Sequence, residues 1–371
     1  MFTLPERINY QKKLNKRLSV KNPSFTYLLS LCAMLLCNCT EREVLIDDTP
    51  SVAMTLRQGP INFDCSYVDN AATRHSNELC NHLATMGVWG WQTDSNGVHT
   101  TTFTNQVVCH NADSARWEYS PIQYWSEGTE YSFCAYAPHQ QETDAEVSID
   151  PETHMISIHH VTLHGYNLQN EPTDAVQELF RNTPDTDWMV ARAGQQAVGM
   201  PGMSVEFAMQ HILAKLNVRI KVDSTLMRKR YISQITADSI IVNKLAAQGD
   251  FQQQLTHTPV LIDPAEAAIN EWTVSDTTLY IKGTRECPIK ETPTYLIESL
   301  VLPQYISPEA IVTLYYSFRF GNGRTEECRY RMRLNEAFAR FASGHNYTLT
   351  FTISPQRIIF EAGATDWKKH S

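Results

Sequence analysis

The sequence predicts an all-β fold, organised as two tandem β-sandwich domains with few short helices. Three observations lead to this prediction. Apolar residues recur at every second position in many short segments, turn-forming residues separate these segments, and strands do not alternate with helices. Period-two patterns are typical of half-buried strands, and many short strands without βαβ units favour sandwiches over a parallel sheet.

The C-terminal part of the chain carries the clearest strand patterns. In residues 347–353 (YTLTFTI) apolar side chains alternate with threonines, which is typical of a half-buried strand. Residues 311–334 predict a β-hairpin, because Gly321-Asn322-Gly323 supplies residues that tolerate a positive φ. On its second arm, Cys328, Tyr330, Met332 and Leu334 should point inward, and Arg329, Arg331 and Arg333 should point outward.

Similar alternation predicts strands within residues 61–68, 86–93, 115–125, 131–138, 216–222 and 278–283. Helical patterns are scarce. Residues 173–182 (TDAVQELFRN) predict a short surface helix, and residues 206–216 (EFAMQHILAKL) predict one or two helical turns. The segment 193–204 is rich in small and turn-forming residues, so we expect the domain boundary there. The predicted domains are residues 58–200 and 201–371.

The N-terminus has the layout of a secretory signal. A basic segment leads into an apolar run at residues 25–36, which is shorter than the roughly 20 residues of a membrane-spanning helix. The run ends in Leu36-Cys37-Asn38-Cys39, which resembles a bacterial lipobox with leucine three places before the modified cysteine. Residues 1–39 are therefore predicted to be a lipoprotein signal peptide with Cys39 as its lipidation site. The alternative is an ordinary secretory signal whose cysteines are incidental.

The charge distribution argues against a nucleic-acid partner. The whole chain has a formal net charge of −9, and its first 39 residues contribute +5, so the remainder carries −14. Six cysteines follow Cys39, and disulfides and buried free thiols are both compatible with their wide spacing. These cysteines are Cys65, Cys80, Cys109, Cys134, Cys287 and Cys328.

Motifs for catalysis or cofactor binding are absent from the sequence. It contains no phosphate loop, dinucleotide fingerprint, nucleophile elbow or zinc-protease helix motif. Four histidines cluster at His154, His159, His160 and His164. On a strand, His160 and His164 would lie roughly 13 Å apart and could not share a zinc ion, and His159 and His160 would point to opposite faces. We therefore predict solvent-facing histidines, no catalytic, cofactor or metal site, and no enzymatic activity.

Two further groups of residues have a functional and a structural interpretation. Arg329, Arg331 and Arg333, joined by Arg319 across the hairpin, could hold an anionic glycan or a phosphate, but we favour an exposed sheet face protected by charge. Five tryptophans could line a sugar-binding platform, but we favour core packing. They are Trp89, Trp91, Trp117, Trp125 and Trp188.

A longer segment carries a resemblance to a known family. Residues 117–138 (WEYSPIQYWSEGTEYSFCAYAP) resemble the fimbrillin family of type V pilus subunits from Bacteroidia. Other pieces resemble the family in the same order along the chain: residues 61–74 with 86–91, 187–193 with 205–222, and 344–367. Together they cover most of the chain after about residue 60.

The resemblance implies two transthyretin-like β-sandwich domains and a role in assembling adhesive pili. In that family a lipidated precursor reaches the outer membrane, and a trypsin-like protease cuts after an arginine and removes the first strand. The groove left open then accepts a strand from a neighbouring subunit. Mapped onto this sequence, residues 40–57 are the removable segment, cleavage follows Arg57, and residues 356–367 (QRIIFEAGATDW) are the donor strand.

We therefore predict a surface lipoprotein that is a pilus subunit or a tip or accessory adhesin and mediates cell adhesion. The expected partners are other pilus subunits, the outer membrane through a lipid anchor, and ligands on host or bacterial surfaces. No cofactor is expected. The alternative is a glycan-binding outer-membrane lipoprotein that does not polymerise.

Overall fold

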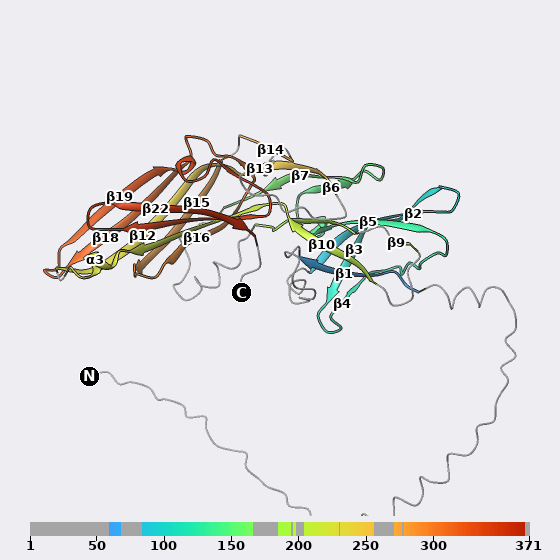
Figure 1. Cartoon of the computed structure of the whole chain (residues 1–371), viewed down its shortest axis with the longest axis horizontal. Coiled ribbons are helices and arrows are strands. Elements are labelled where there is room, and N and C mark those ends of the chain that lie inside the picture. The colour runs from blue at the N-terminus through green and yellow to red at the C-terminus, as the bar shows by residue number, and fades with distance from the viewer. Residues whose placement is uncertain are drawn as a thin grey trace, which may run out of the picture. The chain divides into compact units, whose positions relative to one another are not determined.

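Strands make up nearly all of the regular structure in the computed structural model (Figure 1). The structure describes residues 59–67, 84–165, 185–193, 196–197, 204–229, 231–255, 271–276 and 278–367. Within these ranges the helices are short: η2 (Gln140–Glu142), α3 (Ser224–Met227) and η3 (Leu334–Glu336). In the same ranges, no helix has the length and apolar character needed to cross a membrane.

An eight-stranded sheet contains most of the N-terminal strands. Its order is β1-β10-β8-β5-β2-β3-β4, with β9 paired to β5. The strands are β1 (Asn62–Tyr67), β2 (Thr85–Thr93), β3 (His99–Asn111), β4 (Arg116–Glu118), β5 (Glu130–Ala137), β8 (Met189–Arg192), β9 (Gln196–Ala197) and β10 (Ser204–His211). The two ends of this sheet approach each other, because the Ile61 N–H donates to Gln123 at 2.9 Å and the Trp125 N–H donates to Gly59 at 3.1 Å. The sheet therefore curls around an apolar core.

Strand β5 explains why both faces of this sheet are buried. Tyr131 and Phe133 point into the core inside the curled sheet, where Phe63 of β1 packs against Phe133 with ring centroids 5.9 Å apart. Cys134 and Tyr136 point to the opposite face and belong to a second, larger core. Period-two alternation thus supplies two cores from one strand.

A four-stranded sheet contributes to the second core. Its order is β14-β13-β7-β6, formed by β6 (Glu146–Ile149), β7 (Met155–Thr162), β13 (Gln248–Gln254) and β14 (Trp272–Val274). Ile156 and Ile158 of β7 and Phe251 of β13 are fully buried in the same cluster as Tyr136. This sheet therefore joins strands from before and after residue 200.

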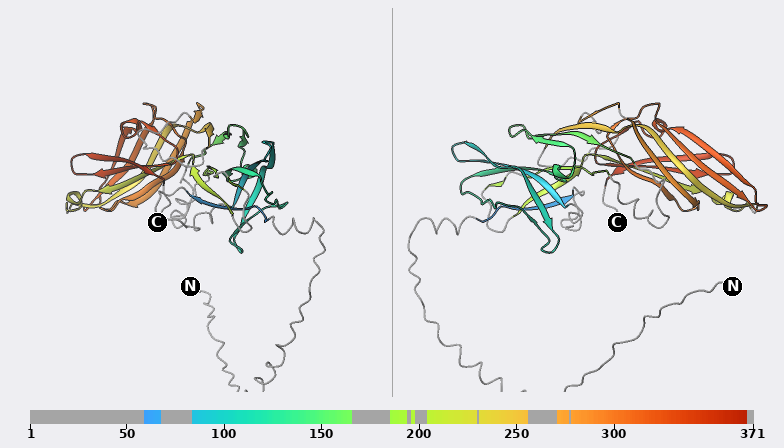
Figure 2. Two further views of the ribbon diagram at one scale, coloured as in Figure 1. Left: turned by 45° about the vertical axis from the view of Figure 1, so that its right-hand side comes forward. Right: turned by 180° about the vertical axis from the view of Figure 1, so that it is seen from behind.

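Two further four-stranded sheets form a sandwich in the C-terminal part (Figures 1 and 2). One has the order β15-β12-β18-β19: β15 (Thr278–Pro288), β12 (Ile232–Ala246), β18 (Ile311–Phe320) and β19 (Thr325–Arg333). The other has the order β16-β11-β21-β22: β16 (Thr294–Val301), β11 (Ala214–Val222), β21 (His345–Ile353) and β22 (Ile358–Asp366). A small pair, β17 (Gln304–Tyr305) and β20 (Arg340–Phe341), completes the described sheets.

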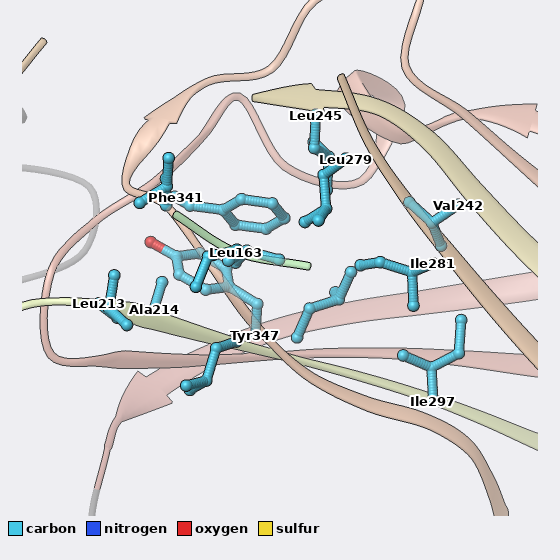
Figure 3. Packing of buried hydrophobic residues seen from close by; sticks show 14 of the residues in the cluster. Leu163, Leu213, Ala214, Val242, Leu245, Leu279, Ile281, Ile297, Phe341 and Tyr347 are labelled. Atoms are coloured by element: carbon cyan, nitrogen blue, oxygen red, sulfur yellow. The ribbon is translucent and has the colours of Figure 1, made fainter. Parts of the chain in front are cut away.

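The sandwich core is made of branched aliphatic and aromatic side chains (Figure 3). Phe341 and Tyr347 meet edge to face with ring centroids 4.8 Å apart, and Leu279, Ile281 and Ile297 lie in the same cluster. The Tyr347 hydroxyl accepts a hydrogen bond from the Ala342 N–H at 2.9 Å, so its buried polar atom is satisfied.

The strand predictions for the C-terminal part are confirmed. Residues 347–353 lie in β21, and residues 311–333 form the β18–β19 hairpin, with Gly323 of its turn at a φ of +85°. On β19 the arginines are exposed and Met332 is buried, as the alternation predicts. The all-β prediction is confirmed, and the two-domain division stays a prediction.

One helical prediction is wrong. Residues 206–211 lie in β10 and residues 214–216 in β11, with a two-residue connection between them, instead of helical turns. Val205, Phe207 and Met209 are buried while Glu206 is exposed, so the segment follows a period of two, and sheet pairing overrides its good helix formers. The other predicted helix, at residues 173–182, lies outside the described residues.

Candidate functional site

Strand β22 lies at the edge of its sheet and contains most of the predicted donor segment (Figure 1). It pairs antiparallel with β21 over nine residues, from Ile358 opposite Ile353 to Asp366 opposite His345. Its second edge faces no other strand in the part of the chain that the structure describes. An edge strand presents a row of unpaired N–H and C=O groups, so β22 is a natural place for pairing with another chain.

Side-chain burial holds β22 only weakly. Ile358 and Phe360 pack against the sandwich core, whereas Ile359 is 39% exposed and residues 361–365 are all exposed. Because little apolar area is buried beyond Phe360, the backbone pairing with β21 provides most of the attachment of the second half of the strand.

The C-terminal end of β22 is fixed by aromatic and charged contacts. The Trp367 ring stacks on His211 with centroids 4.1 Å apart and a 6° angle between planes. The backbone N–H of Trp367 donates to the Gly344 carbonyl at 2.8 Å. His211 also lies 3.0 Å from the carboxylate of Asp187. One position earlier, Asp366 lies 3.6 Å from Nε2 of the buried His345. The donor segment is therefore anchored at the end that follows its exposed part.

The sequence did not reveal this anchor. His211 and Trp367 lie far apart along the chain, and neither belongs to a motif with a fixed spacing. The available signal was Trp367 itself, which lies in the segment 344–367 that resembles the fimbrillin family.

The two modification sites predicted from the sequence, Cys39 and Arg57, lie outside the described residues. The described chain begins just after Arg57, and Gly59 and Ile61 are hydrogen-bonded to Trp125 and Gln123. Of the remaining cysteines, Cys65 is disulfide-bonded. Cys109, Cys134 and Cys328 are free thiols, so both interpretations of the cysteines apply to parts of the set.

The histidine cluster departs from its prediction in two respects. His154 was expected to face solvent, but it is half-buried, with its ring 5.4 Å from that of Trp91. His159 and His160 were expected on opposite faces of a strand, but both are exposed, and their rings lie 6.3 Å apart. The pairing of β7 with β13 shifts between Gly249 and Phe251, and His160 adopts a φ of +64°. This irregularity is a β-bulge, in which His159 and His160 of β7 lie opposite one residue of β13. The alternation of side chains between the two faces of the strand is interrupted there.

Asp250 is the residue opposite this bulge. Its carboxylate accepts the His160 N–H at 2.8 Å and lies 3.5 Å from the His159 ring. The bond from the His160 N–H holds the pKa of Asp250 below its ordinary value, and the two imidazoles act in the same direction. Within the described residues, no group of three or more His, Cys, Asp or Glu side chains is arranged to hold a metal ion.

The arginine and tryptophan groups take the structural roles that we favoured. Arg329, Arg331 and Arg333 are exposed on β19, the edge strand of its sheet. Arg319 does not join them, because it lies opposite Thr325, and the Ser317–Glu327 pair separates it from Arg329. All five tryptophans are buried, with exposures of 8% or less, so they pack in cores and form no surface platform.

Comparison with known proteins gives the family. The model of the fimbrillin-like family matches residues 73–367. A fimbrial protein from Bacteroides vulgatus has a similar structure, with 14% identity, a TM-score of 0.52, and coverage of 83% of this chain and 99% of the other. The tip fimbrial protein Mfa3 from Porphyromonas gingivalis aligns with 10% identity and a TM-score of 0.34 over 84% of this chain and 98% of the other. No curated protein matches the sequence. Because the family model covers well over half of its length, this chain belongs to the fimbrillin-like family.

Proposed function

We propose that this protein is a non-enzymatic subunit or tip component of a fimbrium that mediates cell adhesion. In this proposal a lipid on Cys39 holds the precursor at the outer membrane. Cleavage after Arg57 then removes residues 40–57, and subunits join by strand exchange. Membership of the fimbrillin-like family supports the fimbrial role. The observation that supports strand exchange is the edge position and high exposure of β22.

Strand exchange requires β22 to leave its own sheet, and its weak side-chain attachment lowers the free energy of this step. To enter a neighbour, residues 356–367 must give up nine residues of pairing with β21 and the Trp367–His211 stack. Equivalent backbone hydrogen bonds form in the acceptor, so the exchange is driven by the apolar groove and unpaired edge that cleavage would open there.

The alternative of a glycan-binding lipoprotein that does not polymerise rested on aromatic and arginine surfaces. The five tryptophans form no exposed platform, because all are buried. The exposed arginines of β19 remain available, but they form a line along one edge strand rather than converging on a ligand.

The first test is mass spectrometry of the N-terminal peptide from protein taken from native cells, together with unheated gels. We expect a chain that begins at Gln58 in detergent-resistant ladders. Arg57→Ala should abolish both, and Arg42→Ala, a matched control within the same segment, should leave both intact. A chain that begins at acylated Cys39 without ladders would contradict strand exchange, because the first segment would still be present.

A second pair of variants tests the donor strand separately from cleavage. Ala362 is exposed in the middle of β22, so Ala362→Pro removes a backbone N–H from the strand without disturbing a core, and Ala362→Ser keeps it. We expect Ala362→Pro to start at Gln58 yet form no ladder, and Ala362→Ser to behave as the wild type. Ladders that persist in Ala362→Pro would exclude residues 356–367 as the donor.

A further inference from the structure

We infer that a pocket lined by β2, β3, β5 and β8 and by the β6–β7 turn binds a carboxylate-bearing saccharide. This inference does not depend on strand exchange, since neither β22 nor the N-terminal segment contributes to the pocket. The pocket has a volume of about 560 Å³, within the range of roughly 300–1,000 Å³ that is typical of small-ligand sites. Its lining includes Trp91, Thr93, Thr100, Ser132, His154 and Arg192.

His154 occupies a left-handed backbone conformation, which is uncommon for residues other than glycine. It ends the turn between β6 and β7 with a φ of +55°, and its N–H donates to the Asp150 carbonyl at 2.9 Å. Glycine or asparagine is the relaxed choice at such a position. The imidazole is placed by this turn against Trp91, edge to face at 5.4 Å, with Nε2 3.1 Å from the Ser132 hydroxyl. A strained residue that directs a polar ring into a pocket points to a use for that ring.

Arg192 supplies the charge that selects the ligand. It lies at the end of β8, half-buried, and its Nη1 donates to the Leu255 carbonyl at 3.3 Å. Its Nε is buried without a partner in the described part of the chain. A guanidinium offers five N–H donors in a planar fork, which matches a carboxylate. Because Nε is buried and Arg192 belongs to the pocket lining, a carboxylate that enters the pocket would accept from the terminal N–H groups of the guanidinium.

The residue opposite Arg192 does not neutralise it. Cys134 is its partner in the pairing of β5 with β8. Burial raises the pKa of the Cys134 thiol to about 12, so this side chain is uncharged at neutral pH. The acidic side chains of the pocket, Glu130 and Glu152, are both exposed and therefore belong to its rim.

The rest of the lining suits a ligand rich in hydroxyl groups. Thr100 and Thr101 are exposed at the start of β3, and the Thr93 hydroxyl lies 2.9 Å from Nδ1 of His99. Hydroxyls and neutral imidazoles both donate and accept hydrogen bonds, as sugar hydroxyls do. At the rim, Glu152 accepts from hydroxyls, and both glutamates repel a second acidic group. The pocket therefore fits a short saccharide with one carboxylate, oriented so that this group faces Arg192.

Isothermal titration of the purified protein with glucuronic acid, N-acetylneuraminic acid, glucose and galactose tests the inference. We expect at least one acidic sugar to bind and the neutral sugars to bind at least tenfold more weakly. Arg192→Gln should weaken acidic-sugar binding at least tenfold, and Arg329→Gln, which removes an exposed arginine from β19, should leave it unchanged. Failure of both acidic sugars to bind at 10 mM, or equal binding of neutral sugars, would overturn the inference.

A second variant tests the same pocket in case Arg192→Gln does not fold. Thr100→Trp places a large ring at the exposed rim, where no core packing is disturbed, and should block the same sugars. Thermal unfolding should be unchanged in Thr100→Trp. Undiminished binding by a folded Thr100→Trp protein would show that the sugar sits elsewhere and would also overturn the inference.

Discussion

Replacing Gly283 by alanine should destabilise the protein, because the two sheets of the C-terminal sandwich meet closely at this residue. Gly283 is buried in β15, opposite Ile240 of β12. A Cβ at this position would lie 2.3 Å from the Leu296 carbonyl oxygen of β16 and 3.0 Å from Cγ2 of Ile240. The first of these atoms belongs to the backbone, so a change of rotamer cannot relieve the overlap.

The expected change in unfolding free energy is the difference between two opposing effects. Overpacking of this kind costs about 1–3 kcal/mol of unfolding free energy. Alanine also restricts the unfolded chain, which recovers about 0.4–1 kcal/mol. Gly363 in β22 isolates the second effect, because its Cβ would meet nothing within 4 Å. We therefore expect a loss of about 1–2 kcal/mol for Gly283→Ala and a gain of about 0.4–1 kcal/mol for Gly363→Ala.

Urea unfolding, followed by tryptophan fluorescence and by far-UV circular dichroism, measures both variants. The two probes should give the same transition for each protein, since only then does the unfolding free energy have a single value. Equal unfolding free energies for Gly283→Ala and Gly363→Ala would contradict the close approach of β15 to β16.

Three further predictions concern the N-terminal half. Phe133 is fully buried, so Phe133→Ala should lower the unfolding free energy by about 3–5 kcal/mol in the same urea assay. Tyr305 is 68% exposed, so Tyr305→Ala should change it little. Equal effects of the two substitutions would contradict the assigned core. Burial raises the pKa of Tyr136 from 10.0 to about 12, so the unfolded state loses its proton first and stability should fall as pH rises from about 10 to about 12. Thermal unfolding across this range checks the slope, which should become shallower in Tyr136→Phe. Cys134 is buried with a pKa raised to about 12, whereas Cys109 is exposed. A thiol reagent at pH 8 should therefore label Cys109 rapidly and Cys134 only after unfolding. Equal labelling rates in the native protein would contradict the burial of Cys134.

Local patterns were sufficient wherever a strand keeps a regular period and one face is buried. The alternation in residues 347–353 and the Gly321-Asn322-Gly323 turn predicted β21 and the β18–β19 hairpin together with the orientation of their side chains. These features depend on neighbours within a few residues, and hydrophobic burial acts on each strand separately. The same logic placed the β19 arginines outside.

Patterns failed where the alternation was interrupted or where good helix formers stood among the apolar residues. The bulge at His160 leaves both His159 and His160 exposed, and the spacing of the histidines did not predict a bulge. Residues 206–216 read as helical turns because good helix formers occur among their apolar residues, although the segment is sheet on both sides of Ile212. In these places the partner strand, rather than the local sequence, decided the conformation.

The all-β class, the strands with a regular period and the resemblance to fimbrillins could be predicted from the residues alone. The folded structure was needed to place β22 at a sheet edge with its end held by His211, and to bring His154 and Arg192 into one pocket. Period-two burial is a property of one strand, whereas an edge or a pocket depends on which distant strands pair. That pairing is set by the sum of many weak contacts over the whole fold, which no single segment encodes.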